Sequence, residues 1–188
     1  MDILQKGIVS AAQCRAGGLS YTDLSRLVKS GDLARVAHGV YETVDAPYDE
    51  LYIEQLRRPK AVYSHGTALY LHDLTDRDPI NLSVTVPAGY NTKALINDGF
   101  KVFSIKRELY ETDIIQTHTK YGNPVNTYSI ERTICDVVRS RNRIEAEIVS
   151  TALKRYIRRK DRNIPRLVRT AEQFGIVKLI RTYLEVLL

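Results

Sequence analysis

The chain has 188 residues, of which 44% are hydrophobic and 27% are charged. This composition is typical of a globular protein and excludes a fibrous or disordered chain, and the length favours two domains over one. The first residues do not combine a basic segment with an apolar one, and no stretch of roughly 18 apolar residues occurs. We therefore expect a cytoplasmic protein that is neither secreted nor inserted in a membrane.

The net charge of +6 at pH 7 favours a polyanionic partner, but the charge is unevenly distributed. Residues 1–46 carry five basic and five acidic side chains and are neutral overall. Residues 139–169 carry eleven Lys or Arg against three acids, a local excess of eight positive charges. The excess of positive charge, which nucleic-acid binding would use, therefore lies in the last third of the chain and not in its first 46 residues.

The first 31 residues have the pattern of a helix-turn-helix. Ser10 begins one helix, and Gly17-Gly18 separates it from a second helix that begins after Ser20. Ser20 followed three residues later by Asp23 is the capping-box pattern, and Gly31 is placed to end the second helix. The spacing of three apolar residues predicts one inward-facing stripe on this helix, formed by Leu24, Leu27 and Val28.

A two-stranded hairpin is expected directly after this helix. Apolar residues alternate through residues 33–41, and His38-Gly39 occupies the turn position. This hairpin would be the wing of a winged helix. Residues 49–58 predict an amphipathic connecting helix that ends at Pro59. We therefore expect a DNA-binding domain over residues 1–46 and a second domain over residues 47–188.

The second domain is expected to mix strands and helices and to end in a helical bundle, so the predicted fold class is α+β. The hydrophobic periodicities predict a helix at 66–71, strands at 81–86, 101–105, 114–119 and 125–128, and helices at 129–138, 144–160, 164–174 and 177–188.

The polar face of the second helix carries the side-chain types that contact double-stranded DNA. Arg can hydrogen-bond bidentately to guanine, while Lys, Ser and Thr contact phosphates or bases. A cation beside the hairpin turn can reach the minor groove or the phosphates. The predicted DNA-binding residues are Tyr21, Thr22, Ser25, Arg26, Lys29, Arg35 and His38. Two alternatives stay open: a polar face that is merely solvated, and a winged helix that binds protein.

The basic run in the last third is a second candidate surface. Its side chains, spread along roughly three helical turns between residues 154 and 166, are dense enough to follow a DNA backbone. A solvated helix face, with Tyr156 and Ile157 turned inward, explains them equally well. The candidate residues for DNA-backbone or partner contacts are Arg139, Arg141, Arg143, Lys154, Arg155, Arg158, Arg159 and Arg162.

No catalytic or metal-binding pattern stands out, so we expect no enzyme, cofactor or metal site. Ser64-His65 is interpreted as a helix N-cap followed by a half-buried imidazole. The Asp76-x-Asp78 pair is interpreted as a solvated loop. Cys14 and Cys135 lie far apart among apolar neighbours, which indicates two reduced core thiols.

Several segments together resemble the AbiEi family of type IV toxin-antitoxin antitoxins. They are GGLSYTDLSRLVKSGDLARVAHGVYE, SHGTALYLHDLTDRDP, LSVTVPAGYN, KRELYE, YSIERTICDVVRSRNRI, ALKRYIRRKD and the closing YLEVLL. The resemblance covers nearly the whole chain in order and spacing. One departure is that only residues 1–6 precede Gly7, where the family's first helix is longer.

This resemblance implies that residues 1–46 bind inverted repeats in the protein's own promoter and repress it. It also implies that residues 47–188 are the antitoxin domain and counteract a nucleotidyltransferase-like toxin, often without a stable complex, in abortive infection, a defence against phage. Three alternatives stay open: a C-terminal domain that is an enzyme modifying the toxin or reversing its action, a general winged-helix regulator, and a plain interaction module.

Overall fold

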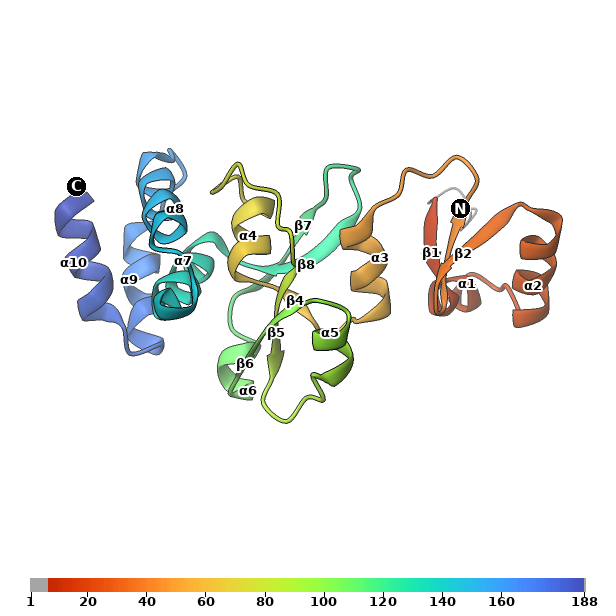
Figure 1. Ribbon diagram of the computed structural model, residues 1–188, viewed down its shortest axis with the longest axis horizontal. Coiled ribbons are helices and arrows are strands. Elements are labelled where there is room, and N and C mark those ends of the chain that lie inside the picture. Colours follow the sequence, from red (N-terminus) through yellow and green to blue (C-terminus); the bar gives the residue numbers. More distant parts are fainter. Residues whose placement is uncertain (1–6, 188) are drawn as a thin grey trace. The chain divides into compact units, whose positions relative to one another are not determined.

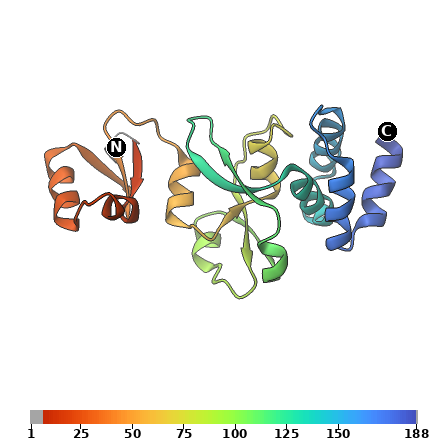
Figure 2. The same cartoon turned by 180° about the vertical axis from the view of Figure 1, so that it is seen from behind.

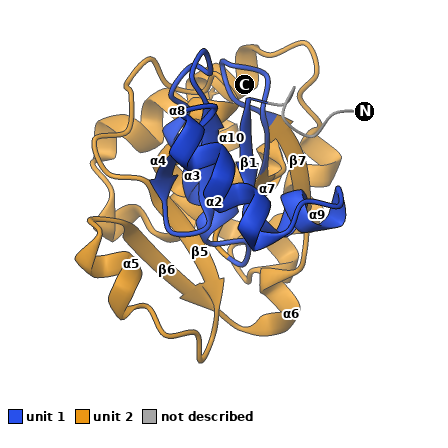
Figure 3. Cartoon of the chain, turned by 90° about the vertical axis from the view of Figure 1, so that its right-hand side faces the viewer, with its two compact units in different colours: residues 1–60, 118–125 blue, residues 61–117, 126–188 orange. Residues whose placement is uncertain are grey.

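The computed structural model describes residues 7–187, and Figure 1 shows its helices and strands in chain order. Packing divides the chain into two compact units, coloured in Figure 3. Unit 1 comprises residues 1–60 and 118–125, and unit 2 comprises residues 61–117 and 126–188. The division into functional domains at residue 46 stays a prediction.

Unit 1 begins with a small sheet, against which two helices pack. Its elements are β1 (Ile8–Ser10), α1 (Ala11–Ala16), α2 (Tyr21–Ser30), β2 (Leu33–Ala37), β3 (Val40–Thr43) and α3 (Glu50–Arg57). The strands are antiparallel in the order β1-β3-β2, so β3 is the central strand. The predicted helix pair and hairpin are confirmed, with a register irregularity between Arg35 and Ala37 in β2. The apolar residues Ile3 and Leu4 and the rest of the segment before Gly7 lie outside the described residues.

A compact core holds the two helices on this sheet. Val9, Cys14, Leu24 and Leu33 are each at most 2% exposed, and the half-buried Leu27 packs against them. Val28, however, is 37% exposed, so its predicted inward position is wrong. Leu24, one turn before Val28, already fills the space over the sheet, and the helix ends two residues after Val28.

Helix α3 is tied to a segment far along the chain. The buried Asp49 caps α3, since its Oδ1 accepts a hydrogen bond from the backbone N–H of Tyr52. Its Oδ2 accepts hydrogen bonds from the hydroxyl of Thr119 and, at 2.8 Å, from the side-chain amide of Asn123. These contacts explain why residues 118–125 belong to unit 1.

A five-stranded mixed sheet follows. Its strands are β4 (Val62–Tyr63), β5 (Ser83–Pro87), β6 (Lys101–Ile105), β7 (Ile114–His118) and β8 (Pro124–Tyr128), in the order β6-β5-β4-β8-β7. β5 is parallel to β6 and antiparallel to β4, which is parallel to β8. Three short helices accompany the sheet: α4 (His65–Leu71), α5 (Lys93–Asn97) and α6 (Arg107–Tyr110).

The last third is a helical bundle, seen from behind in Figure 2. It contains α7 (Ile130–Arg139), the 3₁₀ turn η2 (Arg141–Arg143), α8 (Ala146–Arg158), α9 (Ile164–Gln173) and α10 (Val177–Leu187). These helices share one core with α4, and Leu69, Ile134, Leu153, Tyr156 and Leu167 are among its fully buried members. None of the helices within residues 7–187 combines the length and apolar character needed to cross a bilayer.

The α+β class is confirmed, as are all the helices and strands expected beyond residue 46, to within two residues at most ends. The elements that were not predicted are β1, β4, α5, α6 and η2. Each is five residues or shorter, so none is long enough to display a helix or strand period.

Candidate nucleic-acid interface

The sequence sets both ends and the rotation of α2. The Ser20 hydroxyl accepts a hydrogen bond from the backbone N–H of Asp23 at 3.1 Å, and the Asp23 carboxylate accepts the backbone N–H of Ser20 at 3.0 Å. Gly31 ends the helix in the left-handed region at φ +85°, which glycine adopts without strain. Because Leu24 is 1% exposed, the opposite side of α2 must face outward.

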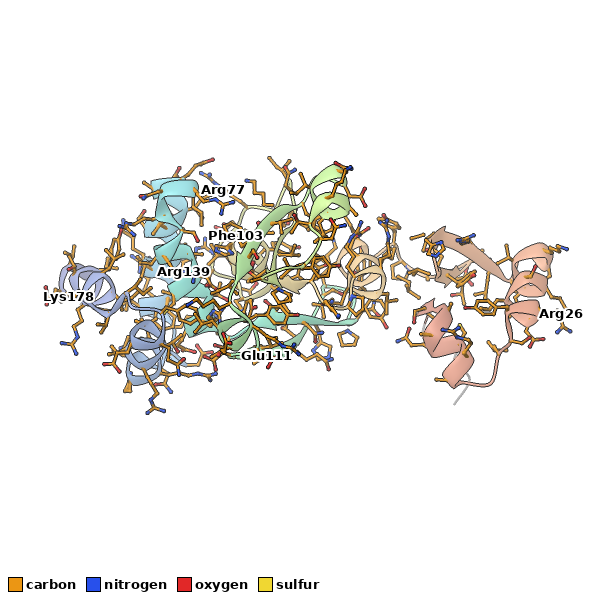
Figure 4. All side chains as sticks on the ribbon, turned by 90° about the horizontal axis from the view of Figure 1, so that it is seen from below. Arg26, Arg77, Phe103, Glu111, Arg139 and Lys178 are labelled. Atoms are coloured by element: carbon orange, nitrogen blue, oxygen red, sulfur yellow. The ribbon has the colours of Figure 1, made fainter. Side chains whose placement is uncertain are left out.

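That outward side carries four of the predicted DNA-binding residues. Thr22, Ser25, Arg26 and Lys29 are all exposed. The Arg26 side chain is 74% exposed, and Figure 4 shows it extending from α2 away from α1 and the small sheet. The four side chains are therefore accessible to a duplex.

Arg26 is not unpaired in the free chain. Its guanidinium forms an ion pair with Asp23 one turn earlier. Hydrogen bonds from Ser20 lower the pKa of Asp23, and Arg26 lowers it further, so the carboxylate is charged at neutral pH. An anionic ligand would have to compete with Asp23 for Arg26, which favours a partner that offers Arg26 a well-aligned bidentate contact.

Arg15 is a candidate that the sequence patterns did not single out. It lies in the last turn of α1, and its Nη1 donates a hydrogen bond to the Tyr21 hydroxyl at 2.7 Å. The guanidinium carbon also lies 5.1 Å from the centre of the Tyr21 ring. Tyr21 is 62% exposed, so the pair presents an ordered cation at the turn between α1 and α2. The sequence could have indicated Arg15 as a candidate, because it is a basic residue at the end of the first helix.

The hairpin holds its two candidate residues together. Arg35 Nη2 lies 3.0 Å from His38 Nδ1, and Arg35 Nε donates to the backbone oxygen of Ala37 at 3.4 Å. Arginine has no acceptor, so His38 Nδ1 must be the acceptor and carry no proton in this arrangement. Both side chains are exposed, which leaves the turn available for a contact.

The basic run of the last third does not form one continuous helix, so its predicted arrangement along three turns is wrong. Helix α8 ends at Arg158 and α9 begins at Ile164. The intervening loop carries Arg159 and Arg162, while Arg139 lies in α7 and Arg141 and Arg143 lie in η2. The break follows from Pro165, whose ring is accommodated in the first turn of α9 but not inside a longer helix.

Three of the candidate cations are engaged inside unit 2. Arg139 pairs with Asp136 at 3.0 Å, Arg155 with Asp76, and Arg159 with Asp161 at 2.9 Å. Arg159 also donates to the backbone oxygen of His72. The other candidates are exposed and have no carboxylate partner among residues 7–187: Arg141, Arg143, Lys154, Arg158 and Arg162. Among the eight candidate residues, these five therefore supply the positive charge that no carboxylate pairs with.

A buried polar network surrounds His65, which is 1% exposed rather than half-buried as predicted. Its Nδ1 lies 2.9 Å from the Ser64 hydroxyl and its Nε2 3.0 Å from the Ser140 hydroxyl. Its ring stacks on Phe103, with centroids 3.4 Å apart. The predicted helix cap is also wrong, because the Ser64 hydroxyl does not cap α4 and instead accepts a hydrogen bond from Thr85 at 2.9 Å.

The surroundings of His65 disfavour its charged form. Burial lowers its pKa well below the ordinary value, and Arg139, Arg132 and Arg143 lower it further. His65 also has a positive φ of 47°, which is uncommon for a residue with a side chain. The sequence indicated a histidine beside a serine but not their burial, because Ser140 and Phe103 meet His65 only through the tertiary fold.

A buried ion pair lies next to this network. Arg132 is 0% exposed, and its Nε donates to Asp136 Oδ2 at 2.8 Å. Its Nη1 donates to the backbone oxygens of Leu109 and Thr112 at 2.7 and 3.0 Å. The guanidinium also lies over two rings, 4.1 Å from the centre of Tyr128 and 4.2 Å from that of Phe174. The contacts of Arg132 are those of a structural group that fixes the loop before β7 against α7.

The cysteines and the Asp76 carboxylate do not come together in one site. Cys14 and Cys135 are both buried free thiols, and burial raises the pKa of Cys135 to about 12. Asp76 is exposed and paired with Arg155. Within the part of the chain that the structure describes, no three His, Cys, Asp or Glu side chains are grouped to hold a metal ion.

Comparison with known proteins bears on the N-terminal segment and on the fold. Residues 3–44 match the family model described as "Transcriptional regulator, AbiEi antitoxin", which confirms the resemblance over that segment. Among solved structures, the RV2827C protein from Mycobacterium tuberculosis matches with a TM-score of 0.55 and 12% sequence identity. The match covers 88% of this chain and 66% of that one, so the present chain spans slightly less than two thirds of its length. At this identity the likeness shows the fold alone. No curated protein matches the chain.

Proposed function

We propose that this chain, whose residues 3–44 match the AbiEi antitoxin family of transcriptional regulators, is the autorepressor and antitoxin of a type IV toxin-antitoxin operon. In this proposal residues 1–46 form a winged helix that binds inverted repeats in the promoter of the protein's own gene. Unit 2 counteracts a nucleotidyltransferase-like toxin in phage defence and has no catalytic role. The site of action is the cytoplasm.

The observation that carries the proposal is the outward face of α2. The order β1, α1, α2, β2, β3 is that of a winged helix, in which α2 would be the recognition helix. This face carries two cations, Arg26 and Lys29, and two hydroxyls, Thr22 and Ser25, all exposed. The hairpin adds Arg35 beside its turn. A cationic and hydroxyl-bearing face of this kind suits the major groove.

DNA binding by α2 is tested with the full chain and a labelled duplex from the region upstream of its own gene. We expect Arg26→Ala to weaken binding by about 1–3 kcal/mol if Arg26 contacts a base, and Lys29→Ala to weaken binding to all sequences alike. Arg107→Ala is the matched control, because Arg107 is also exposed and is paired with a nearby carboxylate, that of Glu111 directly after α6. Unchanged affinity in both α2 variants would exclude α2 as the recognition helix.

Antitoxin action is tested separately by co-expression with the product of the neighbouring gene. The proposal expects a nucleotidyltransferase-like toxin there, whose growth inhibition is relieved by the wild-type chain and equally by Arg26→Ala. Because a catalytic role in unit 2 is not part of the proposal, Asp76→Asn should also rescue growth. Loss of rescue by Asp76→Asn with the fold retained would favour an enzyme instead, and a neighbouring metabolic gene would leave a general regulator.

A further inference from the structure

A cavity of about 560 Å³ lies within unit 2, between α9 and the loop that connects α6 to β7. The loop contributes Thr112 and Asp113 to the lining, and α9 contributes four polar residues: Arg166, Arg169, Thr170 and Gln173. Sites for small molecules usually have volumes of roughly 300–1,000 Å³. The cavity is therefore large enough for one small molecule.

The α9 side of the cavity is a polar helix face. Its four polar residues follow the i, i+3, i+4, i+7 spacing, so they lie on one side of α9. The other side carries Leu167 and Ala171, which are buried in the core of unit 2. Pro165 supplies the apolar part of the lining, and no aromatic side chain of residues 7–187 lines the cavity. Such a lining suits a hydrophilic ligand better than a nucleobase, which usually stacks on an aromatic ring.

The loop that faces α9 is fixed by its own hydrogen bonds. Arg132 donates to the backbone oxygen of Thr112 at 3.0 Å, and the backbone N–H of Ser129 donates to the backbone oxygen of Asp113 at 2.9 Å. The Asp113 backbone is held at φ +59°, which is uncommon for a residue with a side chain. Its carboxylate pairs with Arg166 at 2.8 Å. Because the loop is already ordered, a ligand would bind there without a large ordering cost.

The groups that remain available in the cavity are one cation and several hydrogen-bonding groups. Arg169 is exposed and has no carboxylate partner among the described residues, so its guanidinium can bind a phosphate bidentately. The pair with Arg166 uses Oδ1 of Asp113, and Oδ2 has no donor in the part of the chain that the structure describes. This oxygen can accept a hydrogen bond from a ligand hydroxyl. The Thr170 hydroxyl and the Gln173 amide can each donate and accept.

We propose that this cavity is a binding site for a sugar phosphate, in which Arg169 binds the phosphate while Asp113, Thr170 and Gln173 bind the sugar hydroxyls. A ligand with a second anionic group in place of the hydroxyls would be repelled by Asp113. The site goes beyond the proposed function, because it requires neither α2 nor a toxin. Inorganic phosphate and the free sugar each lack one of the two recognised parts and should bind more weakly.

The test uses the full chain and ribose 5-phosphate as the probe, with binding measured by isothermal titration calorimetry. Inorganic phosphate and ribose are titrated separately. We expect a Kd of about 1 mM or tighter for ribose 5-phosphate, the affinity that ligands of this size commonly reach, and affinities at least about tenfold weaker for the other two. An absence of ribose 5-phosphate binding would overturn the proposal. Equal affinity for inorganic phosphate would overturn it too, because the sugar would then make no contribution.

Two variants assign the contacts to residues. Arg169→Gln should weaken ribose 5-phosphate binding at least about tenfold. Its matched control is Arg181→Gln, since Arg181 is also exposed and has no carboxylate partner within residues 7–187. Thr170→Val keeps the shape of a side chain that is 3% exposed and removes its hydroxyl, so it should weaken binding by about three- to tenfold. Equal affinities of the Arg169→Gln and Arg181→Gln variants would contradict the proposed phosphate contact.

Thermal unfolding followed by circular dichroism checks that each variant is folded. Ribose 5-phosphate should raise the Tm of the wild-type chain and of Arg181→Gln, and should raise that of Arg169→Gln much less. A ligand-induced rise in Tm that is the same in all three proteins would place the binding site elsewhere.

The result is separable from the test of α2. Arg26→Ala should bind ribose 5-phosphate as the wild type does, whatever its effect on promoter DNA. Unchanged promoter binding by Arg26→Ala would therefore count against the proposed function alone, and a titration without ribose 5-phosphate binding would count against the cavity alone.

Discussion

In unit 1, Arg26 leaves 74% of its side chain in solvent and pairs with Asp23 in a region open to a ligand. In unit 2, Arg132 is fully buried, pairs with Asp136 and is flanked by the rings of Tyr128 and Phe174. The two ion pairs have similar sequence spacing, three and four residues. Burial, and not the presence of an ion pair, therefore separates an arginine available for binding from one that supports the fold.

Replacing the buried arginine, Arg132, should cost the most stability. Arg132→Met leaves the Asp136 carboxylate buried with only Arg139 as a partner, so we expect a loss of about 3–5 kcal/mol in the free energy of unfolding. Arg26→Met, its exposed counterpart, should change stability by less than about 1 kcal/mol. Urea unfolding followed by circular dichroism measures both. A loss below about 1 kcal/mol for Arg132→Met would show that the pair is dispensable.

The next effect concerns the pH dependence of unit 2. His65 has a folded-state pKa depressed by burial, so its contribution to stability is present above the unfolded-state pKa of about 6.5 and is lost as pH falls toward the folded value. Between pH 7.5 and pH 5, this loss approaches about 2 kcal/mol for a histidine that stays neutral while folded. His65→Gln should remove that part of the pH dependence, whatever its effect at pH 7.5. An unchanged difference between the two pH values would contradict the neutral, buried assignment.

The smallest effect compares two serines that each precede a helix. Ser20 caps α2, so Ser20→Ala should destabilise that helix by about 1 kcal/mol, and Ser20→Thr should retain most of the cap. Hydrogen exchange of the amides in residues 21–30 reports the change locally. Ser64 makes no cap, so the amides at the start of α4 should respond to Ser64→Ala only through the loss of its bonds to His65 and Thr85. Protection of α2 that is insensitive to Ser20→Ala would argue against the capping box.

The outcome for these two serines shows what sequence patterns can predict. Ser20 and Asp23 act on each other across one helical turn, so their residue types and spacing suffice to predict the cap. Ser64 and His65 depend on Thr85 and Ser140, which the fold brings to them from 21 and 75 residues away. The long helices and the outward residues of α2 were predictable for the same local reason. The burial of His65 and Arg132 required the tertiary structure.

The basic run of residues 139–169 shows that charge pairing, like burial, depends on contacts that local sequence does not predict. The sequence predicts an excess of eight positive charges over residues 139–169, yet Arg155 and Arg139 are engaged by Asp76 and Asp136. Counting acids within the run overlooked Asp76, which lies 79 residues earlier than Arg155. The composition of a segment therefore overstates the charge that it offers to a partner.

The contacts of Asp49 bear on the order in which the protein is completed during synthesis. Its carboxylate is buried, and two of its hydrogen-bond donors, Thr119 and Asn123, are added about seventy residues later. A nascent chain that ends at residue 60 contains the whole of α3 but lacks these donors, and a buried carboxylate without them is destabilising. Unit 1 therefore reaches its final packing only after most of the sheet of unit 2 has left the ribosome.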